Sequence, residues 1–161
     1  MKRIVVTVLF FMFAVPHAGI SEELPPFAPE SLLAPVENLK QDAEYLKICR
    51  LQSHGLVLEK EKINYLLNRI KYSKYAFIRN GRAVSAEKTS EFLHWKYARK
   101  AGKKKIQTAE DFVLNIASGS DMSGEPYRVK TDRYKKYPLR DFMLRELAYL
   151  ETLLNECPAD A

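Results

Sequence analysis

The sequence is poor in the residues from which several kinds of active site are built. It holds 2 cysteines and 3 histidines, and the histidines outside the N-terminal leader, His54 and His94, lie too far apart in sequence to suggest a zinc site. No G-x-S-x-G motif occurs, so the turn that presents the nucleophilic serine of α/β-hydrolases is not expected. We therefore expect no metal and no cofactor. A content of 47% hydrophobic and 29% charged residues is typical of a globular protein.

Long hydrophobic runs are absent except at the N-terminus. Lys2 and Arg3 precede the uncharged run Ile4–Val15 of twelve residues, and a proline and small residues follow. This order is that of a cleavable signal peptide, and the run is shorter than the roughly twenty residues that span a bilayer. We predict a signal peptide over residues 1–21, cleaved near Ser21, and a periplasmic or secreted mature chain without a transmembrane span.

Proline is concentrated just after this leader, with four prolines in the twelve residues Leu24–Pro35. Such a composition resists regular structure and is typical of an extended spacer. We predict a spacer over residues 22–35 and one helical domain over residues 36–157. A mature chain of roughly 140 residues buries about two-thirds of the surface that its unfolded form exposes, which is enough for an independent core.

Apolar residues recur at helical spacing in most of that domain. Ser85 is a predicted N-cap, Thr108 opens a capping box with Asp111, and Pro138 suits the first position of the final helix. Phe92 and Leu93 are the expected core residues of the helix that follows Ser85. The predicted helices cover about residues 36–52, 58–72, 85–101, 108–117 and 138–156.

Strand signals are few. Asn80-Gly81 is a strong two-residue turn signal and predicts a hairpin over Tyr75–Val84, and Tyr127–Thr131 has the composition of one more strand. The predicted fold class is mostly α, with four to five helices, a short β-hairpin and room for a third short strand.

The two cysteines, Cys49 and Cys157, permit a disulfide, since an exported chain with an even number of cysteines often forms one. Two unpaired, partly buried thiols are the alternative. Both cysteines follow predicted helices, so a bridge requires that the C-terminal ends of those helices meet, with Cα atoms about 4.4–6.8 Å apart.

Several short motifs follow one another between Ile63 and Leu147. The most specific are F-I-R-N-G at Phe77–Gly81 and the pattern T-A-E…F…A-S-x-S-x-x-S-G-x-x-Y over residues 108–127; Lys96 lies between them. As a set these motifs resemble the YfeK-like proteins, a family of small exported bacterial proteins of unknown function. The resemblance implies a signal peptide and one helical domain with a hairpin, and it carries no catalytic residue across.

Charge is distributed unevenly. The segment from Lys71 to Arg145 holds 18 Lys and Arg against 8 Asp and Glu, a net charge of +10. This segment suits an anionic polymer, a lipid head group or a protein partner, whereas export argues against nucleic acid. A solvated basic face that aids solubility is the alternative. The candidate anion-binding residues are Arg79, Lys96, Lys103, Lys104, Lys105 and Arg128.

These observations favour a non-enzymatic exported domain that binds an anionic partner at the cell envelope. The alternative is a small hydrolase that uses Ser118, Ser120 or Ser123 with His94. Turn formation explains these serines equally well, and core packing is the simpler expectation for His94.

Overall fold

The computed structural model describes residues 32–35, 39–102, 106–131 and 135–157. These ranges hold five α-helices, which confirms the mostly α prediction, and a four-stranded sheet, which has more strands than the two or three expected. None of the described helices has the length and hydropathy needed to cross a membrane. The helices are α1 (Ala43–Arg50), α2 (Leu56–Lys71), α3 (Ala86–Lys100), α4 (Ala109–Phe112) and α5 (Leu139–Leu154), with a 3-10 helix η2 (Leu39–Gln41) before α1 and a π-helix η3 (Val113–Ala117) after α4.

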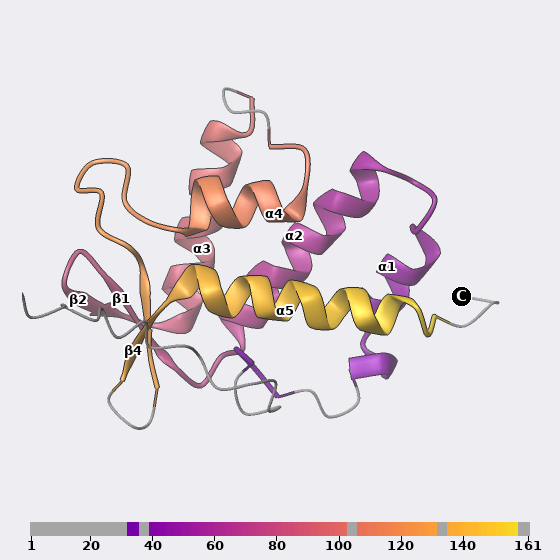
Figure 1. Ribbon diagram of the computed structural model, residues 1–161, viewed down its shortest axis with the longest axis horizontal. Coiled ribbons are helices and arrows are strands. Elements are labelled where there is room, and N and C mark those ends of the chain that lie inside the picture. The colour runs from indigo at the N-terminus through magenta and orange to yellow at the C-terminus, as the bar shows by residue number, and fades with distance from the viewer. Residues whose placement is uncertain (1–31, 36–38, 103–105, 132–134, 158–161) are drawn as a thin grey trace, which may run out of the picture.

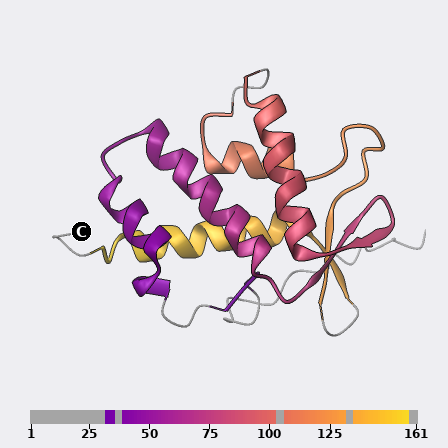
Figure 2. The same ribbon diagram turned by 180° about the vertical axis from the view of Figure 1, so that it is seen from behind.

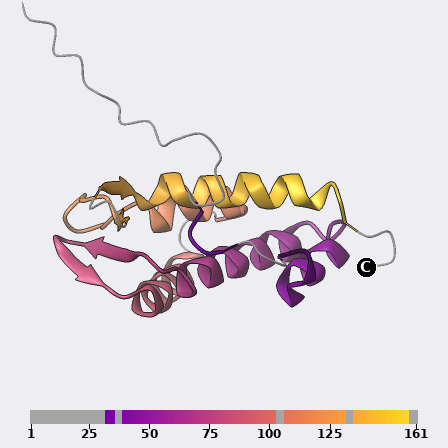
Figure 3. The same cartoon turned by 90° about the horizontal axis from the view of Figure 1, so that it is seen from below.

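The helices form two layers, with the sheet at one end of the molecule (Figure 1). Viewed from below, α5 and α4 lie in one layer and α1, α2 and α3 in the other (Figure 3). Seen from behind, α2 crosses α5 (Figure 2). Fully buried side chains from both layers meet between them and form the core, among them Leu66, Ile70, Leu93, Phe112, Ile116, Phe142 and Leu150.

The sheet is antiparallel, with strand order β2-β1-β3-β4. Asn80 and Gly81 have φ angles of 49° and 74°, the positive values that a tight hairpin turn requires. The strand before the final helix was not predicted, and that helix begins at Leu139 rather than Pro138. The strands are β1 (Ala76–Arg79), β2 (Arg82–Val84), β3 (Arg128–Lys130) and β4 (Lys136–Pro138).

Side-chain caps begin three of the helices. Ser85 caps α3, and Thr108 forms the predicted capping box with Asp111 at α4. The amides of the residues just before α4 donate to Asp111, which lowers the pKa of its carboxyl. Asp42 caps α1 by accepting from two amides, so the predicted helix over residues 36–52 is interrupted there, because aspartate favours the cap over the helix interior.

The last residues of the predicted spacer, 32–35, belong to the folded structure, and we call them the N-terminal strap. Leu32–Ala34 are buried, with Leu33 fully so. The amide of Leu33 donates to Glu146 on α5. The spacer prediction over residues 22–35 is therefore corrected at its C-terminal end, where a proline-rich composition concealed two leucines that enter the core.

A buried ion pair holds the strap in place. Glu146 is fully buried and accepts from Nε of Arg69 at 2.9 Å. The Arg69 guanidinium also donates to the carbonyls of Ala34 and Pro35. Burial raises the pKa of Glu146, although the charge of Arg69 and the amides of the strap act in the opposite direction.

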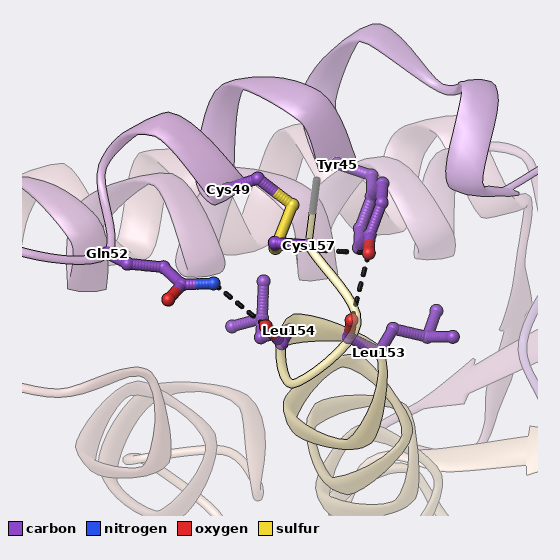
Figure 4. The surroundings of a disulfide bond; sticks show 6 residues. All are labelled: Tyr45, Cys49, Gln52, Leu153, Leu154 and Cys157. Atoms are coloured by element: carbon purple, nitrogen blue, oxygen red, sulfur yellow. Dashed lines mark hydrogen bonds between the residues drawn. A yellow bond between two sulfur atoms is a disulfide. The ribbon is translucent and has the colours of Figure 1, made fainter. Parts of the chain in front are cut away.

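Cys49 and Cys157 are joined in a disulfide, with their Cα atoms 5.6 Å apart. Cys49 lies near the end of α1 and Cys157 just beyond α5, so the C-terminal ends of these two helices meet (Figure 4). Two hydrogen bonds to backbone carbonyls of α5 join the same segments: the Tyr45 hydroxyl donates to the Leu153 carbonyl and the Gln52 side chain to the Leu154 carbonyl.

Candidate functional site

A pocket of about 480 Å³ lies where the β1–β2 hairpin, α3 and the loop over residues 118–126 meet. The hairpin and this loop lie at the end of the molecule farthest from the C-terminal end of α5 (Figures 1 and 2). The Ser123 hydroxyl donates to Oδ1 of Asn80 at 3.2 Å, and a bridge between Gly119 and Pro126 closes the loop. The two motifs that carry the family resemblance therefore meet at this pocket.

Arg79 forms one side of the pocket from the end of β1. Alternation along the strand places it on the same sheet face as the buried Phe77, and its guanidinium carbon lies 4.0 Å from the centroid of the Phe92 ring. Phe92 is only half-buried because its ring forms part of the pocket, whereas its neighbour Leu93 enters the core as predicted. A stacked guanidinium keeps its N–H edges available to an anion.

A second stacked arginine lies farther along α3. Arg99 lies 4.7 Å from the centroid of the Trp95 ring, and that ring lies 5.9 Å from the ring of Phe92. Phe92, Trp95 and Arg99 recur at intervals of three and four residues, so they share one helix face. Together with Arg79 they form a cation–aromatic stack, and within the described ranges neither arginine pairs with a carboxylate.

Lys96 also lines the pocket, but its side chain turns inward. Its ammonium donates to the carbonyls of Ile116 and Gly119 at 2.8 and 2.6 Å, and it lies 3.4 Å from the Asp121 carboxylate. These acceptors surround the charge and hold the loop against α3. We therefore assign Lys96 a positioning role, in place of the predicted contact with an anion.

The remaining charged side chains of the pocket are Lys96, Lys100 and Asp121, and both lysines contact Asp121. Lys100 pairs with Asp121, which leaves the positive charge of the pocket mainly on Arg79 and Arg99. Tyr127 also lines the pocket; burial raises the pKa of its hydroxyl, and the charge of Arg79 opposes that rise.

Of the other predicted anion-binding residues, the structure describes Arg128, and it does not line this pocket. Arg128 pairs with Ile78 in the sheet, so its side chain lies on the face opposite to that of Arg79. Lys103, Lys104 and Lys105 lie outside the described residues. Sequence reasoning missed Arg99, although its helical spacing from Phe92 and Trp95 was a usable signal.

The arrangement of the serines gives no support to the hydrolase alternative. The Ser118 hydroxyl donates to the Leu114 carbonyl at 2.8 Å, and Ser123 bonds to the hairpin turn. His94 is exposed rather than packed in the core, and it lines a different hollow from the one that Ser120 lines. In the described parts of the chain, no hydrogen bond joins His94 to any of these serines, and no three potential metal ligands form a group.

Comparison with known proteins gives a family without an established activity. The profile of a family of unknown function, DUF5329, matches residues 58–151, which overlaps the resemblance noted over residues 63–147 and confirms it. The uncharacterized protein YfeK of Salmonella typhimurium is 37% identical over 70 residues, which are 43% of this chain and 57% of that protein. The matched segment thus spans little more than half of the relative. No solved structure matches the chain.

Proposed function

This chain belongs to the DUF5329 family of unknown function, and we propose that it is an exported, non-enzymatic domain that binds an anionic partner at the cell envelope through the pocket. The observation that carries the proposal is the stack of Arg79, Phe92, Trp95 and Arg99. Two guanidinium groups are held on aromatic rings and lack a carboxylate partner within the described ranges. Stacked arginines of this kind suit bidentate contacts with carboxylate or phosphate.

A basic surface that serves only solubility would account for the net charge, but it gives no reason for this arrangement. Solvated charges repel one another and spread over a surface, whereas Arg79 and Arg99 line one concave pocket. Export is supported by the order of the N-terminal residues and by the disulfide, because such bonds persist mainly in oxidising compartments.

Binding at the pocket can be followed by tryptophan fluorescence, since Trp95 lines the pocket and is the single tryptophan of the chain. We would titrate the mature protein with pyrophosphate and with citrate and follow Trp95 fluorescence, with calorimetry for affinity. Arg79→Ala and Arg99→Ala should each weaken binding about tenfold or more, because a hydrogen bond to a charged group contributes about 1.5–3 kcal/mol. Arg128→Ala removes the same charge from the other sheet face and should leave affinity unchanged. Equal losses of affinity in all three variants would mean that binding depends only on net charge, and would contradict a role for the pocket.

A separate experiment tests whether the chain is exported and cleaved. Fractionation of cells that express the full chain should give a shortened product in the periplasm or medium, with an N-terminus within a few residues of Glu22. Intact Met1 in the membrane pellet would contradict cleavage. A hydrolase screen with Ser120→Ala and His94→Ala tests the enzymatic alternative, because turnover lost in these folded variants would overturn a non-enzymatic role.

A further inference from the structure

The rim of the pocket exposes two large apolar side chains. Met122 is 99% exposed at the tip of the loop, more than any other large apolar residue described, and Trp95 is 52% exposed. Both line the same pocket. Exposed apolar side chains that are grouped at one site are typical of an interaction surface, so this rim suits an occupant with an apolar part.

Basic residues surround this rim. A neighbouring hollow shares Arg79 and Asn80 with the pocket and is also lined by Arg82 and Lys88. Arg82 lies directly opposite Arg79 in the hairpin, and like charges in that position destabilise a sheet. A nearby anion would relieve this repulsion. The acidic residue of the rim, Asp121, is already paired with Lys100.

The loop and the hairpin are held together, so the apolar and basic groups can meet one surface at once. The Ser123 hydroxyl bonds to Asn80, and Lys96 fixes the base of the loop through the Gly119 carbonyl. Both elements lie at the same end of the molecule in views from opposite sides (Figures 1 and 2).

We propose that the anionic partner is the surface of a membrane that contains acidic phospholipids. Met122 and Trp95 enter the interface between head groups and acyl chains, where tryptophan is favoured, and Arg79 and Arg99 bind lipid phosphates. An anionic polymer would use the arginines but would leave the fully exposed methionine in water. This inference rests on the proposed function and names its partner.

The test uses the mature protein and two kinds of vesicle, phosphatidylglycerol mixed with phosphatidylcholine and phosphatidylcholine alone. We expect sedimentation with the acidic vesicles only, a blue shift of Trp95 emission, and weaker binding as salt rises. Arg79→Ala should weaken partitioning about fivefold, the usual effect of one basic residue near an acidic membrane. Met122→Asp should weaken it further, and Met122→Leu should retain it.

Matched controls separate the possible failures. Arg128→Ala should bind like the unchanged protein, and equal loss in this variant would overturn docking through the pocket. Vesicle binding that ignores Met122→Asp would overturn insertion of the loop. If pyrophosphate or citrate binds at Trp95 and vesicles do not, the membrane inference fails and the proposed function stands. If neither the small anions nor the vesicles bind, both the membrane inference and the proposed function fail.

Discussion

We expect Glu146→Gln to be among the most destabilising single substitutions in this chain. Glu146 is fully buried, accepts from the Leu33 amide and pairs with Arg69 at 2.9 Å. Glutamine preserves the volume but removes the charge that balances the buried guanidinium. Breaking a buried ion pair at one partner costs about 3–5 kcal/mol, a large part of the roughly 5–15 kcal/mol that stabilises a domain.

Urea unfolding followed by far-ultraviolet circular dichroism measures this loss. With a slope of about 2 kcal/mol per molar urea, the midpoint should fall by about 2 M. Glu151→Gln is the matched control, since Glu151 lies on the same helix and pairs with Lys62 at 2.6 Å, but half of its side chain is exposed. Its loss should stay below about 1 kcal/mol.

A double-mutant cycle completes the test. Arg69→Met alone leaves the buried carboxylate unpaired, whereas Arg69→Met with Glu146→Gln leaves no unbalanced charge. The double variant should therefore lose less stability than the two single losses added together. Additive losses, or equal losses for Glu146→Gln and Glu151→Gln, would refute the view that this ion pair anchors the strap.

Three further variants test the disulfide, the hairpin turn and the helix cap. Replacing Cys49 and Cys157 together by serine should cost about 5 kcal/mol, because the bond closes a separation of 108 residues; intact-mass analysis with and without reductant checks the bond, and an unchanged urea midpoint would contradict the estimate. Gly81→Ala should lower stability by about 1–2 kcal/mol, since its φ of 74° is unfavourable for a residue with a Cβ; a melting temperature that does not fall would contradict it. Asp111 has a lowered pKa, so its stabilising effect is present above pH 3.8 and is lost as pH falls through that lowered pKa; acid unfolding of Asp111→Asn should lack this component, and identical pH profiles would refute it.

Local chemistry made the turns and caps predictable. The Asn80-Gly81 turn and the capping box at Thr108 depend on residues within a few positions of each other, so the sequence contains all that determines them. Strand β4 depends instead on pairing with β3. Its last residue is Pro138, which is tolerated because β4 is an edge strand, but which sequence reasoning took for the first residue of a helix.

The buried charges were harder to predict because their partners lie far away in sequence. Glu146 occupies a core position of α5 only because Arg69, 77 residues earlier, supplies its counter-charge. Lys96 looked like a free cation, yet it bonds to carbonyls at the end of η3 and in the following loop. Arg79 was one of the candidate anion-binding residues and lines the pocket, whereas Arg99 gains its place in the pocket from its ring contact with Trp95.

The disulfide also constrains the order of events during biogenesis. Cys49 precedes the family segment 58–151 and Cys157 follows it, so the bond encloses every residue that the family profile matches. If the chain crosses a membrane N-terminus first, as the proposed export implies, the pocket residues all arrive on the far side before Cys157 does. Closure must then follow translocation of the whole family segment, and a chain stalled partway would carry a single, unpaired thiol open to mispairing with other proteins.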